Sequence, residues 1–161
     1  MKSPRKVLVL YEHGRAGAAV IDLARDLAEH EGAALTVVAI APQAPSGPRC
    51  GNSALEYNEA VAESVAHDLE QARERLGPAA SAAFVLLVEG ADQTLEQFVR
   101  SGGFDLVLLP AHRRLMRPAG HPAASRLERA AGAEVRIVDG RAGSVSPARQ
   151  RRPPRPAAGA G

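Results

Sequence analysis

The sequence predicts an α/β protein built as a doubly wound parallel sheet with helices on both faces. Short, unbroken apolar runs recur along the chain, and a segment with helical periodicity follows most of them. A strand that is apolar at every position is typical of a parallel sheet buried on both faces, because the crossover helices then cover both sides. We therefore expect five parallel strands and four helices with right-handed crossovers.

The expected strands are short apolar runs bounded by turn-forming residues. Their bounds are Lys6–Tyr11, Leu35–Ala41, Ala82–Val88, Leu106–Leu109 and Val135–Val138. The expected helices have apolar side chains at a spacing of three or four residues. They cover Ala16–His30, Ser53–Leu76, a short segment from about Asp92 to Gly102-Gly103, and Pro122–Ala131.

Local signals set the expected helix ends. Ser53 and Glu56 have the spacing of a capping box, so the long second helix is expected to begin at Ser53. Asp92 is expected to cap the short third helix, and Gly32 stands where a left-handed C-cap belongs. The second helix should be about 36 Å long, because about 24 residues rise 1.5 Å each. A helix of this length would overhang the sheet.

Composition divides the chain into two parts. The 161 residues suffice for one domain, and we place it at residues 1–140. Residues 141–161 are rich in Pro, Arg, Ala and Gly and have no apolar periodicity, so we expect a disordered basic tail. The tail holds five arginines and no acid, so the net charge of +2 for the whole chain becomes −3 for residues 1–140. A nucleic-acid-binding body is thereby disfavoured, although the tail's arginines remain candidates for contact with RNA or acidic lipid.

Cysteine content and hydropathy bear on location. The single cysteine, Cys50, excludes an internal disulfide and fits a reducing compartment. No apolar stretch approaches the ~18 residues of a membrane helix, and the apolar run after the basic N-terminus is too short for a signal peptide. We expect a soluble cytoplasmic protein.

Two segments carry a resemblance to a known family. KVLVLYEHG, beginning at Lys6, resembles the opening strand of universal stress proteins, which typically ends V-D-G-S, with Glu12 at the aspartate position. FDLVLLPAHRR, beginning at Phe104, is similar to their fourth strand and its loop, typically D-L-I-V-M-G-T-H-G-R. The element order and the long second helix agree with this family over roughly residues 5–139. The resemblance implies a divergent member with the strand order 3-2-1-4-5.

The same comparison implies a departure at the nucleotide site. Nucleotide-binding members carry the motif G-2x-G-9x-G-[S/T], whose glycines let backbone N–H groups approach the phosphates. In this register Pro110 and Arg113 replace the first two glycines, and His121-Pro122 or Ala123-Ala124 lies near the third. Proline has no N–H to donate, and an arginine side chain fills space that the phosphates would occupy. We therefore expect weak ATP binding or none, and no other cofactor.

The implied strand order places two loops side by side at the point where the order reverses. We expect the loops after the first and fourth strands to form a crevice lined by Glu12, His13, Arg15, His112, Arg113 and Arg114. These side chains could bind a phosphate or carboxylate through arginine forks instead of backbone groups. A metal held by Glu12, His13 and His112 is an alternative, although no local ligand spacing supports it, and simple solvation of the loops is another. We predict no metal.

Two classes of function follow, because no catalytic constellation stands out. The favoured one is a non-enzymatic universal-stress-type protein that acts through dimerisation and contacts with an unidentified protein partner. The alternative is a ligand-responsive member that binds ATP, AMP or another anion in the crevice; an enzyme of the wider adenine-nucleotide superfamily comes third. We expect a homodimer through the last strand, Val135–Val138, because the implied order places it at the edge of the sheet.

Overall fold

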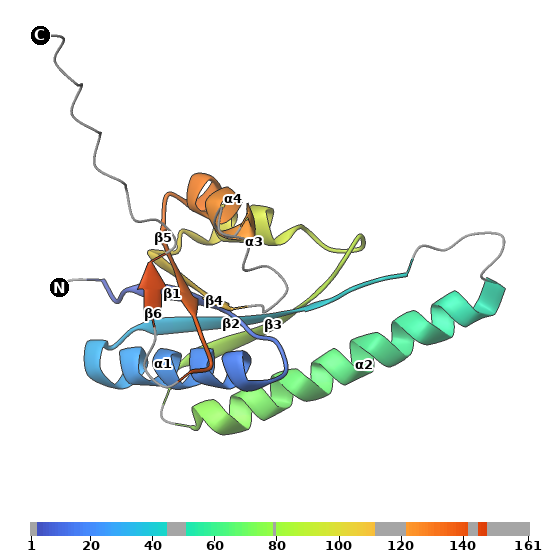
Figure 1. Ribbon diagram of the computed structural model, residues 1–161, viewed down its shortest axis with the longest axis horizontal. Coiled ribbons are helices and arrows are strands. Elements are labelled where there is room, and N and C mark those ends of the chain that lie inside the picture. Colours follow the sequence, from blue (N-terminus) through green and yellow to red (C-terminus); the bar gives the residue numbers. More distant parts are fainter. Residues whose placement is uncertain (1–2, 45–50, 79, 112–121, 142–144, 148–161) are drawn as a thin grey trace, which may run out of the picture.

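The structure of the protein is a computed structural model that describes residues 3–44, 51–78, 80–111, 122–141 and 145–147. A central sheet is covered on each face by two helices (Figure 1). The strands are β1 (Lys6–Leu10), β2 (Ala34–Ala41), β3 (Ala82–Val88), β4 (Leu106–Pro110), β5 (Glu134–Val138) and β6 (Val145–Pro147). The helices are α1 (Arg15–Glu31), α2 (Gly51–Leu76), α3 (Leu95–Gly102) and α4 (Pro122–Ala131).

The sheet has the order β3-β2-β1-β4-β5-β6, and β1 to β5 are all parallel. The prediction of five parallel strands in the order 3-2-1-4-5 is confirmed. One feature of it is wrong: β5 is not an edge strand among the described residues, because β6 pairs with it in the antiparallel direction. Residues 141–161 were expected to be disordered, but Val145–Pro147 of this segment form β6. For the rest of the segment, disorder stays a prediction.

Two apolar layers fill the space between the sheet and its helices. Val7 and Val9 of β1 face α1 and α2, whereas Leu8 faces α3 and α4, so alternate residues of one strand serve opposite layers. All three side chains are fully buried. Strands with apolar residues at every position are needed here because both faces are covered.

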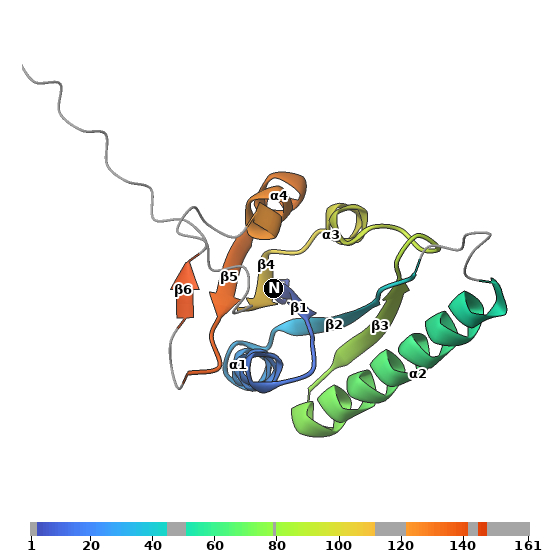
Figure 2. The ribbon, with the colours of Figure 1, turned by 45° about the vertical axis from the view of Figure 1, so that its right-hand side comes forward.

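Helix α2 lies along one face beside α1 and extends past the end of the sheet (Figures 1 and 2). Its carboxyl half packs on the core through Leu69, Ala72 and Leu76. Leu55 and Tyr57, in its amino half, are more than half exposed. The overhang expected from the helix length is thus present.

Two predicted helix starts are wrong. Helix α2 already includes Gly51, so Ser53 does not occupy the N-cap position. Helix α3 is capped by Thr94, whose hydroxyl accepts from the Gln97 N–H at 3.3 Å while the Gln97 side chain accepts from the Thr94 N–H at 2.9 Å. Asp92 accepts instead from the Val88 N–H at 2.7 Å, where it closes the turn after β3. The predicted left-handed Gly32 is confirmed, with φ of 65°.

Candidate functional site

A cleft of about 550 Å³ opens at the carboxyl ends of β1, β4 and β5. It lies where the strand order reverses, because β1 is flanked by β2 and β4, which are far apart in the sequence. The lining residues come from three segments. They are Glu12, His13, Arg15, Ala16, Gly17, Pro110, Ala111, Asp139, Gly140 and Arg141.

Glu12, His13 and Arg15 line this cleft, as the sequence predicts. His112, Arg113 and Arg114 lie outside the described residues, so their share of the predicted crevice stays a prediction. The three residues that follow β5, Asp139, Gly140 and Arg141, were missed. Their position directly after a predicted strand was a usable signal, since the carboxyl ends of parallel strands meet at one edge of a sheet.

The floor of the cleft is made by the close approach of α1 to the loop after β1. A Cβ atom on Gly17 would lie 1.7 Å from the backbone oxygen of Glu12, so only glycine fits this first turn of the helix. Gly14 stands at the N-cap of α1 with φ of 121°, and it provides no side-chain cap. Ala16 and Gly17 of that uncapped first turn line the cleft.

The two lining residues from the end of β4, Pro110 and Ala111, have no backbone donor left for the cleft. Pro110, the last residue of β4, has no N–H. The next N–H, that of Ala111, donates to the carbonyl oxygen of Val138 at 2.9 Å. Neither residue therefore offers a backbone donor to a molecule in the cleft.

Charges of both signs line the described part of the cleft. Arg15 and Arg141 are the cations, while Glu12 and Asp139 are the anions. The Asp139 carboxylate accepts from the Arg141 backbone N–H at 3.4 Å. The lining therefore has no excess of formal positive charge when His13 is neutral.

His13 reaches from the rim of the cleft to helix α2. Its Nδ1 lies 3.3 Å from a carboxylate oxygen of Asp68, and its side chain is 69% exposed. The same Asp68 carboxylate raises the pKa of Tyr11, although burial is the larger cause of that rise. No group of three or more His, Cys, Asp or Glu side chains in the described part of the chain could hold a metal ion. The metal alternative also needs His112, which lies outside that part.

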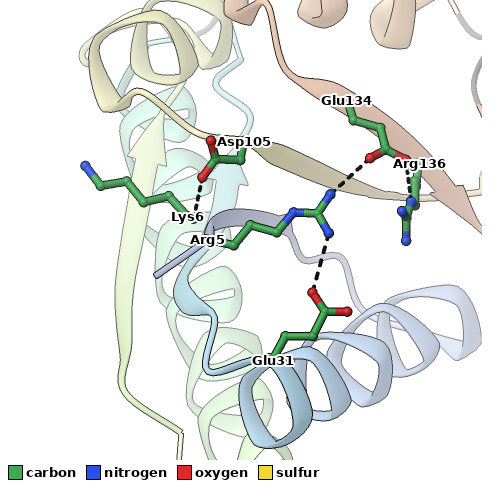
Figure 3. Close-up of polar contacts among 6 residues, drawn as sticks. All are labelled: Arg5, Lys6, Glu31, Asp105, Glu134 and Arg136. Atoms are coloured by element: carbon green, nitrogen blue, oxygen red, sulfur yellow. Dashed lines mark hydrogen bonds and ion pairs between the residues drawn. The ribbon is translucent and has the colours of Figure 1, made fainter. Parts of the chain in front are cut away.

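A second polar cluster occupies the opposite, amino end of the strands (Figure 3). Arg5 bridges two carboxylates: its guanidinium lies 3.0 Å from Glu134 and 3.5 Å from Glu31. Glu134 also accepts from Arg136 at 2.7 Å, which is the largest cause of the lowered pKa of its carboxyl group. This cluster joins β5 and α1 to the segment that precedes β1, at the end of the sheet remote from the cleft.

Among the described residues, no helix is both long enough and apolar enough to cross a membrane.

A model of the universal stress protein family matches residues 4–129, which is most of the chain. The chain belongs to the universal stress protein family. The comparison with curated proteins gave no match.

Solved structures of universal stress proteins share the fold. A family protein from Burkholderia pseudomallei is 23% identical with a TM-score of 0.63, over 83% of this chain and 94% of that one. UspA from Lactobacillus plantarum is 18% identical with a TM-score of 0.68, over 83% of this chain and 97% of that one. A universal stress protein in complex with cAMP is 17% identical with a TM-score of 0.58, over 86% of this chain and 99% of that one.

Proposed function

We propose that this universal stress protein is a non-enzymatic regulatory or stress-response protein that binds ATP weakly or not at all. It acts through dimerisation and through contacts with a protein partner. We place its action in the cytoplasm, because one cysteine and no disulfide fit a reducing compartment.

One observation carries the proposal: of the described residues at the end of β4, neither Pro110 nor Ala111 offers a backbone donor to a phosphate. Pro110 has no N–H, and the Ala111 N–H is held by the Val138 carbonyl at 2.9 Å. Pro110 stands where the nucleotide-binding motif has its first glycine, and Arg113 stands at the second. A phosphate cradle made of backbone N–H groups needs donors that point at the ligand, and it needs glycine for close approach.

The balance of charge in the cleft supports the same proposal. A triphosphate brings several negative charges, and a binding site usually meets them with an excess of cations or with a metal ion. Here Glu12 and Asp139 oppose Arg15 and Arg141 across the described lining. The described part of the lining therefore offers a polyanion little net attraction.

The alternative function is a ligand-responsive member that binds ATP, AMP or another anion through side chains. The volume of the cleft favours it, since about 550 Å³ lies in the range of small-molecule sites. Arg15 lines this volume, and His112, Arg113 and Arg114 would extend its side-chain donors beyond the described residues. A protein of the same fold has been solved with cAMP.

Comparing the native chain with Arg113→Ala separates the two functions. Both proteins are titrated with ATP, AMP and inorganic pyrophosphate by calorimetry, and the mixtures are then analysed for products. The proposed function predicts no saturable heat below about 0.1 mM and no product. Tight binding that Arg113→Ala abolishes would support the side-chain alternative, and a hydrolysed or adenylated product would contradict the non-enzymatic role.

A further inference from the structure

Strand β3 is the last strand at one end of the sheet, and among the described residues no strand lies on its outer side. It pairs with β2 over seven residues, from Ala82 to Val88. Leu87 is the only one of these residues that is buried. Figure 2 shows β3 at this end of the sheet, with α2 running alongside it. An edge of this kind presents backbone N–H and C=O groups that can pair with a further strand.

Backbone contacts at the two ends of β3 show which of its groups face outward. The Ser81 carbonyl accepts from the Leu35 N–H of β2 at 3.4 Å, and the Glu89 N–H donates to the Ala41 carbonyl at 2.9 Å. Odd-numbered positions therefore point their backbone groups toward β2, and even-numbered positions point theirs outward. The outward-facing residues are Ala82, Phe84, Leu86 and Val88.

The turn after β3 already uses the outward groups of Val88. Its N–H donates to the Asp92 carboxylate at 2.7 Å, and its carbonyl accepts from the N–H groups of Ala91 and Asp92 at 3.2 and 2.9 Å. Within the described part of the chain, no such bond occupies the outward groups of Ala82, Phe84 and Leu86. A strand of about five residues would cover this length, because paired strands advance at the same rate.

The β3 edge lacks the residues that usually keep a sheet edge from pairing. Charged side chains, prolines and bulges serve that purpose in other sheets. Ala82–Val88 reads AAFVLLV, with neither a charge nor a proline, and its register with β2 has no bulge. At the other end of the sheet, β6 has only three residues and ends in Pro147. Of the two ends, β3 is therefore the one that suits a further strand.

One side of α2 runs beside this edge. Arg73 identifies that side, because its guanidinium lies 4.6 Å from the centre of the Phe84 ring of β3. Arg75 points the other way, to α1. Ala62 and Ala66 lie eleven and seven residues before Arg73, so they share its side of the helix. Ala62 is half-buried and Ala66 is exposed, and these small side chains leave room for a side chain of an added strand.

The alanines have acidic neighbours. Glu59 is exposed and lies three residues before Ala62, so the two are adjacent on the helix surface. Residues 54–66 of α2 hold three glutamates and no basic residue. Glu70, farther along, already pairs with Arg73 at 3.6 Å. A long basic side chain on an added strand would lay its apolar stem on the alanines and bring its charge to Glu59.

The opposite face of the edge is apolar. Val85 and Leu87 belong to the apolar layer on the side of α3, and Val85 is only half-buried. Side chains of an added strand alternate between the two faces, so every second one would meet α2 and the others would lie beside Val85. β-Branched residues suit the second set, because they pack well on a pleated, half-buried surface.

We propose that the outer edge of β3 binds an extended segment of a partner protein in which basic residues alternate with β-branched ones. The segment adds an antiparallel strand along Ala82–Leu86, since antiparallel pairing is the more stable kind. Its basic side chains lie toward α2 and Glu59, and its β-branched ones lie beside Val85. The inference rests on the partner contact that we include in the proposed function, and it adds the surface and the chemistry of the partner.

The test titrates the isotope-labelled native chain with synthetic peptides and follows its amides by NMR. The first peptide has about nine residues, blocked ends and valine alternating with arginine. A second has glutamate in place of arginine. Two more carry N-methyl groups on the arginines or on the valines, which removes alternate N–H donors. Phe84 faces the α2 layer, so the arginines of an antiparallel strand point their N–H groups toward β3.

The proposal predicts saturable binding of the arginine peptide with a dissociation constant below about 1 mM. Methylation of the arginines should abolish binding, whereas methylation of the valines should not. Hydrogen exchange of the Phe84 and Leu86 amides should slow by about tenfold or more, with Val85 unchanged because its N–H points to β2. Glu59→Lys should weaken binding by about three- to tenfold. Glu29→Lys, the same reversal at an exposed position of α1, is the matched control and should change nothing.

Equal binding of the two methylated peptides, or protection of amides outside β3, would overturn strand addition. Tighter binding of the glutamate peptide would overturn the basic chemistry of the partner. If no peptide binds, the inference fails while the proposed function stands, because its ATP affinity and product analysis are measured separately. If the Phe84 and Leu86 amides are protected without peptide, and more so at higher protein concentration, a second copy occupies the edge and the peptide assignment is wrong.

Discussion

The guanidinium of Arg75, near the end of α2, holds both carboxylate oxygens of Asp22 on α1, with distances of 2.9 and 2.8 Å. The two residues are 53 positions apart in the sequence, and they join the two helices that cover one face of the sheet. A bidentate arginine–carboxylate pair has a defined geometry, unlike most surface ion pairs. It therefore fixes the position of α2 relative to α1.

This pair predicts a pH dependence of stability. The hydrogen bond from Arg75 holds the pKa of Asp22 below its ordinary value of 3.8. A carboxyl group with a lowered pKa in the folded state contributes stability above its unfolded pKa, and the contribution is lost as pH falls through the folded value. Because both side chains are more than a third exposed, Arg75→Ala should cost only about 0.5–1 kcal/mol at pH 7.

Urea unfolding at pH 7 and pH 3 measures this effect. The cost of Arg75→Ala should be smaller at pH 3, which lies below the ordinary carboxyl value of 3.8, so that the contribution of the pair is already falling. In an Asp22→Asn background, the pairwise part of the cost should vanish at both pH values. An equal cost in both backgrounds at pH 7 would show that the pair contributes nothing.

The cap of α3 gives a second prediction. Thr94→Ala removes the hydroxyl that accepts from Gln97, so it should lower the free energy of unfolding by about 1 kcal/mol. Thermal or urea unfolding checks the value, and Thr94→Ser, which keeps the hydroxyl, is the matched control. A loss of the same size in Thr94→Ser would place the effect in the methyl group instead of the cap.

Gly17 gives a third prediction, at the floor of the cleft. In an exposed helix, replacing glycine by alanine adds up to about 1 kcal/mol of stability. Here the new Cβ would lie 1.7 Å from the Glu12 carbonyl oxygen, so backbone must move and Gly17→Ala should destabilise by about 2 kcal/mol or more. Ala60→Gly, in the exposed part of α2, is the control: its change in the free energy of unfolding measures the effect of helix propensity alone. If the Gly17→Ala variant were more stable than the native chain, the loop after β1 would have to move away from the new Cβ atom at little energetic cost.

The strands and helices were largely predictable, because a strand buried on both faces is a continuous apolar run and a packed helix has a regular apolar spacing. Ala82–Val88 and Pro122–Ala131 have the bounds that their patterns predict. Helix starts were harder, since several residues near one start can cap it. Asp92 and Thr94 both carry a suitable oxygen, and the turn that follows β3 uses the first and leaves the second for α3.

Strand β6 was not predictable from its own residues. Val145–Pro147 has neither length nor periodicity, and it forms a strand because the outer side of β5 offers it a partner. The cleft was half predictable. Glu12 and Arg15, which follow the first predicted strand, were placed in it, whereas Asp139, Gly140 and Arg141 were missed although they follow the last predicted strand.

The affinity of the native chain for ATP tests the central claim most directly, because the claim is that Pro110 and Ala111, the described residues at the end of β4, offer a phosphate no backbone donor. Isothermal titration calorimetry with ATP and Mg²⁺ measures that affinity. The use of the Ala111 N–H by Val138, and the lack of one on Pro110, predict a dissociation constant no tighter than about 0.1 mM, or ~5.5 kcal/mol of binding free energy. A micromolar dissociation constant that Arg113→Ala leaves unchanged would contradict it.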